Sequence, residues 1–274
     1  MQDLKQTISS YSGKDLKQRK GWYSPAAEAY NQTRPRYPQG LIDRVAEIAH
    51  LSTTSKILEL GCGPGTATVA FAQLGCSILC VEPNPDFCQL AQNNCEPYPC
   101  VEIQNTSFEE WDLEADKFDA VLAASSFHWI PPAIAYPKAA NALRAHGSLI
   151  LLWNNQLQPQ YDVHQCLSEI YQVHAPSLAK YEARETQVAI LRGLGQMVLD
   201  SGQFKNLVTE QLVCEVVYNA NDYLTLLSTY SPYLALDSQT RDALFAGLRD
   251  KIEQNLGGTI HLSYLSAFHV AQKN

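Results

Sequence analysis

The sequence has little positive charge for its size. Its 274 residues contain 20 Lys and Arg against 28 Asp and Glu, which gives a net charge of −8. A protein that binds a nucleic-acid backbone draws on clustered Lys and Arg, so this balance argues against nucleic acid as the main partner. We therefore expect a small-molecule partner.

Long apolar runs are also absent. No stretch approaches the roughly 18–20 consecutive apolar residues of a membrane span, and the N-terminus lacks the apolar core of a secretory signal. We expect a cytoplasmic protein with no membrane partner, present as a monomer or homodimer.

The eight cysteines form no recognisable pattern. They include no Cys-x-x-Cys pair and have no matching histidine spacing. Zinc sites and disulfide frameworks require such patterns, so we predict neither a metal site nor disulfides. The cysteines are expected to be reduced and mostly buried thiols.

What the sequence does contain is a regular alternation of short apolar strands and amphipathic helices. The predicted strands are 56–60, 77–81, 101–104, 118–124 and 148–153, and the predicted helices are 41–49, 67–74, 85–94 and 133–144. Because strands and helices alternate, we expect an α/β fold with a mostly parallel sheet.

The segments outside this alternation are assigned by composition. Residues 1–21 are basic with little apolar periodicity and are predicted to be a mobile tail. Residues 22–154 are then the cofactor-binding core with an N-terminal lid, and 155–203 a helical cap inserted over the site. Residues 204–274 are expected to complete the sheet and the acceptor site. Their β-like runs at 207–218 and 259–270 flank helices near 221–230 and 238–254.

Residues 56–66, Lys-Ile-Leu-Glu-Leu-Gly-Cys-Gly-Pro-Gly-Thr, run from a strand into a glycine-rich turn. Gly61, Gly63 and Gly65 permit positive φ angles or close approach of a ligand to the backbone. Glu59 would repel the pyrophosphate of a dinucleotide, whose fingerprint also requires glycine where Thr66 stands. S-adenosylmethionine carries an ammonium and a sulfonium and no phosphate, so it is the predicted cofactor.

Three later residues suit the adenosine part of such a ligand. Glu82 ends the second strand, where an acid can accept hydrogen bonds from a ribose diol, as it also does in nicotinamide enzymes. The alternative is an acid that faces only solvent. Ser107 and Phe108 follow the third strand and could contact adenine, although Ser107 with Glu110 could equally form a helix capping box.

The fourth strand ends in Ser125-Ser126-Phe127-His128-Trp129, at the sheet edge where α/β proteins bind ligands. Ser125 and Ser126 are predicted to border the cofactor. His128 is the candidate general base, with a packed turn as the alternative. Trp129 is the candidate wall of the acceptor site.

An aromatic and arginine-rich segment precedes the first core helix. Tyr30, Arg34 and Tyr37 could close over the cofactor as a lid in which Arg34 holds the methionyl carboxylate, and a Pro-restricted connector is the alternative. Tyr230 and Ser231 are further acceptor-site candidates. The predicted cap adds weaker candidates, which are Tyr161, His164, Tyr171, His174, Arg184 and Arg192.

Taken together, these residues resemble class I S-adenosylmethionine-dependent methyltransferases. The Tyr-xxx-Arg-Pro-x-Tyr-Pro pattern of 30–38, the turn 59–66, Phe118-Asp119, the 126–129 motif and Trp153-Asn154 resemble the branch that contains trans-aconitate methyltransferase, over residues 22–155. The resemblance implies a Rossmann-like three-layer sandwich, with a seven-stranded sheet whose last strand is antiparallel. It also implies a set of residues bordering the cofactor, namely Glu59, Gly61, Gly63, Glu82, Phe108 and Ser125 or Ser126.

The predicted reaction is in-line methyl transfer from S-adenosylmethionine to an oxygen, or less favourably a nitrogen, of a small molecule, with carboxylic acids among the candidates. A carboxylate needs no base, and Arg34, Arg184 or Arg192 would orient it, whereas a phenol or amine would give His128 more weight. One alternative is an NAD-dependent oxidoreductase, which Glu59 and Thr66 disfavour. Another is a non-catalytic S-adenosylmethionine-binding protein, which would lack an enclosed acceptor pocket.

Overall fold

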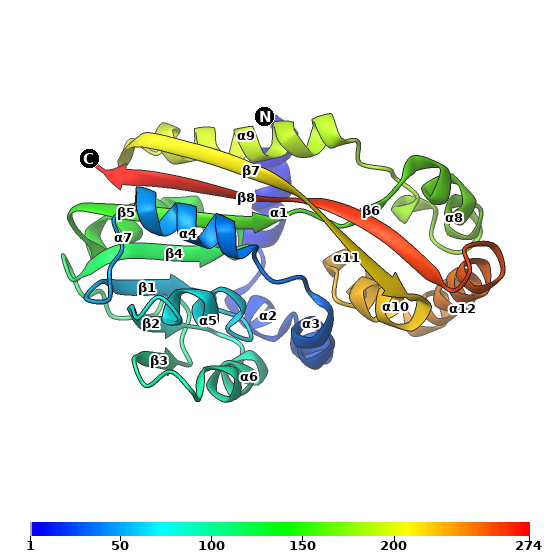
Figure 1. The fold of residues 1–274 in the computed structure, drawn as a ribbon, viewed down its shortest axis with the longest axis horizontal. Helices are drawn as coiled ribbons and strands as arrows, with labels where there is room; N and C mark the ends of the chain where they lie inside the picture. The colour runs from blue at the N-terminus through cyan, green and yellow to red at the C-terminus, as the bar shows by residue number, and fades with distance from the viewer. Residues whose placement is uncertain (1) are drawn as a thin grey trace.

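A computed structural model describes residues 2–274 and contains one mixed sheet flanked by helices (Figure 1). The strand order is β3-β2-β1-β4-β5-β8-β6, and β7 pairs with the other edge of β8. The strands are β1 Lys56–Leu60, β2 Ser77–Val81, β3 Val101–Gln104, β4 Phe118–Ala124, β5 Leu143–Asn154, β6 Gln158–Pro159, β7 Phe204–Asn219 and β8 Thr259–Lys273. Strands β1 to β5 pair in parallel and β8 is antiparallel to β5, so the expected fold is confirmed, with the two-residue β6 as an addition.

Alternating side chains of the strands build two separate cores. In β1, Ile57 packs on one face with α4 Gln39–Ile48, α5 Thr66–Ala72 and α6 Pro85–Cys95. Leu58 packs on the other face with α7 Pro132–Ala142 and α9 Arg184–Asp200. This period of two is the reason that a parallel sheet needs helices on both faces.

The long strands β7 and β8 extend beyond the core and carry a third apolar cluster at their far end (Figure 1). Three helices gather there, which are α8 Tyr161–His174, α10 Ala220–Ser228 and α12 Ser238–Asn255, with the short α11 Ser231–Leu234 nearby. Helix α8 packs on α12, whereas α9 lies along β7 and β8. The segment 155–203 therefore does not form one cap over the core.

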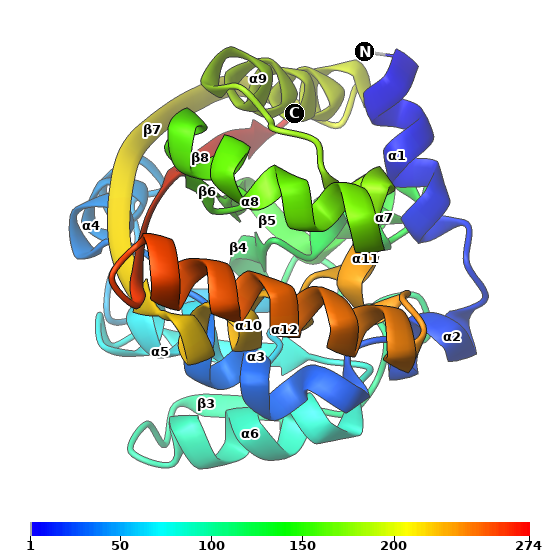
Figure 2. The same cartoon turned by 90° about the vertical axis from the view of Figure 1, so that its right-hand side faces the viewer.

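The N-terminal segment differs from the predicted mobile tail. Residues 2–21 form α1 Gln2–Ser12 and α2 Leu16–Gly21, and α3 Ala27–Thr33 follows (Figure 2). Ile8 is buried, and the Tyr11 ring contacts His128 and Trp129. The signal that was missed is the spacing of apolar Leu4, Ile8 and Tyr11 on one helix face. No helix within residues 2–274 has both the length and the hydropathy needed to cross a membrane.

Candidate functional site

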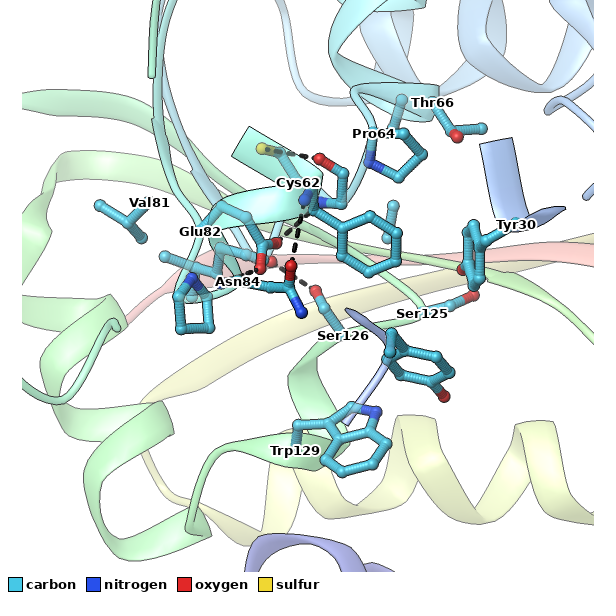
Figure 3. Close-up of a pocket in the computed structure, with 18 of the residues that line it drawn as sticks. Tyr30, Cys62, Pro64, Thr66, Val81, Glu82, Asn84, Ser125, Ser126 and Trp129 are labelled. Atoms are coloured by element: carbon cyan, nitrogen blue, oxygen red, sulfur yellow. Dashed lines mark hydrogen bonds between the residues drawn. The ribbon is translucent and has the colours of Figure 1, made fainter. Parts of the chain in front are cut away.

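A pocket opens at the carboxyl ends of β1, β2 and β4, beneath the N-terminal segment (Figure 3). Most of the predicted cofactor residues and Trp129 line it. They are Tyr30, Arg34, Tyr37, Gly61, Gly63, Glu82, Ser107, Phe108, Ser125, Ser126 and Trp129. From the predicted cap, only Leu157 contributes to the wall that the described residues form. The N-terminal segment therefore lines this site, as expected of the lid, and the predicted cap does not cover it.

The three glycines of the turn have the positive φ angles that their sequence predicts. Gly61 has a φ of +64°, and a Cβ at this position would lie 2.9 Å from the Ser126 Cβ. Gly65 also has a positive φ, of +85°, but it is not part of the pocket wall, because it faces Cys95 of α6. Gly61 thus packs closely on Ser126, and both Gly61 and Gly63 lie in the pocket wall, whereas Gly65 serves the packing of two helices.

Glu82 is held in a fixed orientation at the pocket. Its Oε2 accepts the N–H of Gly63 and its Oε1 accepts the N–H of Asn84, both at 2.8 Å (Figure 3). Burial raises the pKa of the Glu82 carboxyl to about 7, although the two N–H donors favour the charged form. Each carboxylate oxygen keeps a lone pair, so the group can still accept hydrogen bonds from a ligand.

Glu59 does not line the pocket. It lies fully buried behind the turn, where its Oε2 accepts the Thr68 hydroxyl at 2.7 Å. Burial raises the pKa of its carboxyl to about 7. The expectation that Glu59 meets the ligand directly is therefore not supported, and any effect on ligand choice acts from behind the backbone.

At the other end of the pocket, Ser107 and Phe108 form part of the wall. The Ser107 hydroxyl donates to the Glu110 carboxylate and accepts the Glu110 N–H, which is half of a capping box, at a turn and not at a helix. The Ser107 carbonyl accepts the N–H groups of Glu110 and Trp111, and the Phe108 ring stacks on Trp111. Arg19 of α2 closes this end, with its Nη1 2.6 Å from Glu109 and 2.7 Å from the Trp129 carbonyl.

His128, the candidate base, lies outside the pocket wall. It contributes to a separate small apolar cavity with Ile8, Tyr136 and Trp153. Burial lowers the pKa of its imidazole to about 4, and its Nδ1 has no hydrogen-bond partner in residues 2–274. The packed-turn alternative fits these contacts better than a catalytic role.

Aromatic rings form the wall nearest the lid. Tyr23, Tyr30, Phe87 and Trp129 contact one another with centroid separations of 5.3–6.0 Å. The Tyr37 hydroxyl lies 3.2 Å from that of Ser125. Tyr230 and Ser231 stand behind this wall and contact Arg34 and Tyr23, respectively. Sequence reasoning did not assign Arg19 and Phe87 to the site, because their sequence positions carry no motif.

The remaining arginine candidates lie elsewhere. Arg184 donates to Ser263 and Gln187, and Arg192 is on an exposed helix position. Neither is part of the pocket wall formed by the described residues. Arg19 is paired with Glu109, so Arg34 is the arginine of this wall that has no carboxylate partner among residues 2–274.

Parts of the chain are similar to known proteins. Residues 57–147 match the family described as Methyltransferase domain. An uncharacterized methyltransferase of Mycobacterium tuberculosis is 33% identical over 134 residues, which cover 49% of this chain and 52% of that protein. A methyltransferase-like protein of Schizosaccharomyces pombe is 31% identical over 128 residues, which cover 46% and 49%. The chain thus spans about half the length of the curated relatives it matches.

Solved structures share the fold. A protein described as a type II methyltransferase, from Anaeromyxobacter dehalogenans, has a TM-score of 0.63 at 19% identity, over 87% of this chain and 97% of that one. A phosphoethanolamine N-methyltransferase of Haemonchus contortus, solved with S-adenosylhomocysteine, has a TM-score of 0.52 at 14% identity, over 93% and 58%. Residues 57–147 thus match a methyltransferase domain, and the chain shares its fold with a solved protein described as a methyltransferase. The likeness to the trans-aconitate branch stays a resemblance.

Proposed function

We propose that the protein transfers a methyl group from S-adenosylmethionine to an oxygen of a small molecule, with a carboxylate as the favoured acceptor. The adenosine would lie between Glu82 and Phe108, and the methionyl group would lie between the glycine turn and Arg34. The methyl group would then face the wall that contains Tyr23, Tyr30 and Trp129. Aromatic faces stabilise a neighbouring sulfonium through their quadrupole.

The observation that carries this proposal is the inventory of proton acceptors in the pocket. Its wall, as formed by residues 2–274, contains no His and no Lys. Glu82 accepts two backbone N–H groups and would face the adenosine and not the acceptor, Glu109 is paired with Arg19, and the pKa of Tyr23 is raised to about 12 by burial. An acceptor that must lose a proton finds no free base there, whereas a carboxylate is already ionised.

The rate of methyl transfer then depends on how the protein aligns the acceptor with the methyl group. The acceptor oxygen attacks the methyl carbon, the carbon–sulfur bond breaks, and S-adenosylhomocysteine leaves as a neutral thioether. Holding the two reactants in line can lower the barrier by about 7–11 kcal/mol in well-oriented systems. A lid that excludes water also protects the donor and strengthens the electrostatic contacts.

Two measurements test the proposal. Calorimetric titration with S-adenosylmethionine, S-adenosylhomocysteine and NAD should give micromolar affinity for the first two and none for NAD. Selective NAD binding would favour an oxidoreductase instead. A panel of small carboxylic acids, each beside its amide, phenol and amine analogues, should then give S-adenosylhomocysteine release for carboxylic acids. Cofactor binding with no turnover of any panel member would favour a non-catalytic binding protein.

A further inference from the structure

Three consecutive residues of the C-terminal third contact the pocket wall from behind. Thr229 bonds Arg34, the centroid of the Tyr230 ring lies 4.0 Å from the Arg34 guanidinium carbon, and the Ser231 hydroxyl lies 3.1 Å from that of Tyr23. Arg34 belongs to the pocket wall that the described residues form, and residues 229–231 do not. The segment 229–231 therefore supports a pocket residue without touching the pocket itself.

A chain of hydrogen bonds fixes the Thr229 hydroxyl. The hydroxyl donates to the Leu226 carbonyl at 2.6 Å, so its proton is already used. Its oxygen accepts the Nε–H of Arg34 at 2.8 Å, and the Thr229 carbonyl accepts from Nη2 at 2.9 Å. Two acceptors on one residue define the plane of the guanidinium group.

The bonds to Thr229 leave one nitrogen of the Arg34 guanidinium group free to bind a ligand. The guanidinium carbon also lies 4.7 Å from the Tyr30 ring centroid, so aromatic contacts add to the hydrogen bonds. Nη1 is the guanidinium nitrogen for which residues 2–274 supply no hydrogen bond. Thr229 is completely buried, so water does not compete for its bonds to Arg34.

We propose that Thr229 is a positioning residue, which orients Arg34 so that Nη1 binds the carboxylate of the methionyl group of the cofactor. The inference rests on the proposed function, because that carboxylate belongs to S-adenosylmethionine. An arginine that is already held in its binding orientation loses less side-chain entropy when a ligand arrives. Thr229 thereby favours a nucleoside with an amino-acid group over the bare nucleoside.

The test compares two nucleosides. S-adenosylhomocysteine carries the methionyl-derived carboxylate, and 5′-methylthioadenosine shares the adenosine and thioether but lacks the amino-acid group. In Thr229→Val, which keeps the side-chain volume and removes the hydroxyl, we expect calorimetry to give about tenfold weaker binding of S-adenosylhomocysteine. Binding of 5′-methylthioadenosine should change by less than about twofold. Thr229→Ser should restore the wild-type ratio.

Two further variants complete the design. Thr225→Val makes the same change one turn earlier, where the hydroxyl bonds only a carbonyl of its own helix, and should leave both affinities unchanged. Arg34→Lys keeps the charge but cannot make both bonds to Thr229, so it should show the same selective loss even if Thr229→Val does not fold. The double variant should bind no more weakly than the weaker of the two single variants, because both remove one shared interaction.

The results distinguish a failure of the positioning role of Thr229 from a failure of the proposed function. Equal weakening of both nucleosides, or no change in either, would overturn the positioning role while leaving the proposed function intact. Failure of the wild-type protein to bind S-adenosylhomocysteine would overturn the proposed function itself.

Discussion

At the residue scale, the Glu82 carboxylate has hydrogen-bonding capacity left for a ligand. Glu82 accepts one backbone N–H on each oxygen, so a ribose diol would complete its hydrogen bonds. In Glu82→Ala, we expect binding of S-adenosylhomocysteine to weaken by about 10–100-fold, the size of a lost hydrogen-bonded charged partner. Calorimetry measures the loss, and Glu102→Ala on the exposed side of β3 is the control. Unchanged affinity in Glu82→Ala would refute the ribose assignment.

The titration of Glu82 gives a second prediction. Burial raises the pKa of its carboxyl to about 7, and the charged form is the one that accepts hydroxyl groups. The free protein must lose a proton before binding, so affinity should rise with pH. Between pH 6 and pH 8 we expect about a tenfold gain for 5′-methylthioadenosine, which has no titrating amino-acid group. Glu82→Gln should abolish the dependence, and a flat profile in the wild-type protein would contradict this account.

The position of His128 predicts that it is not the general base that the sequence suggests. A general base contributes about 10²–10⁴-fold to a rate, so its removal is easy to detect. Because His128 lies outside the pocket wall, His128→Phe should keep methyl transfer within about threefold of wild type, which is far less than a base supplies. The measurement is the turnover number with the acceptor found in the panel. A loss of a hundredfold, with the folded state intact, would restore the catalytic role.

At the element scale, α2 holds the adenosine end of the pocket closed. Arg19 and Glu109 form a pair with only 11% and 13% of their side chains exposed, unlike Lys20 and Glu110 at 33% and 49%. Breaking a buried pair mainly speeds dissociation, so Arg19→Gln should raise the rate at which S-adenosylhomocysteine leaves by at least about tenfold.

Stopped-flow tryptophan fluorescence can follow this release, because Trp129 lies in the pocket wall. Lys20→Gln removes the exposed pair and should change the rate by less than about twofold. Equal rates in wild type and Arg19→Gln would show that α2 does not limit ligand exit.

At the scale of the whole molecule, β8 joins the core to the C-terminal helices, and a buried side-chain hydrogen bond adds to its antiparallel pairing with β5. The Trp153 indole N–H donates to the His269 Nδ1 at 2.9 Å. His269→Ala leaves that N–H unpaired and opens a cavity, so the free energy of unfolding should fall by about 2–4 kcal/mol. Denaturant unfolding measures it, with exposed His261→Ala on the same strand expected to stay within about 0.5 kcal/mol. A matching small effect of both variants would contradict this role.

The elements of the core could be predicted from the sequence because short segments determine them. The positive φ angles of Gly61 and Gly63, the Asn84 cap of α6 and the alternation in β1 all depend on neighbouring residues. The cap and the tail were harder to predict. Whether α2 or α8 covers the pocket depends on contacts between residues far apart in the chain, which periodicity does not encode.

The sequence by itself determined the sheet, the glycine turn and the acid at the end of β2, because strand alternation and backbone permissiveness are properties of short segments. Only the tertiary structure decided which polar groups face the pocket. Glu59 and Glu82 both lie near strand ends, yet Glu59 is inside β1 and bonds Thr68 of α5, whereas Glu82 follows β2 and lies in the pocket wall. Likewise, Arg34 and Thr229 meet across 195 positions only because β7 and β8 bring the C-terminal helices back to the lid.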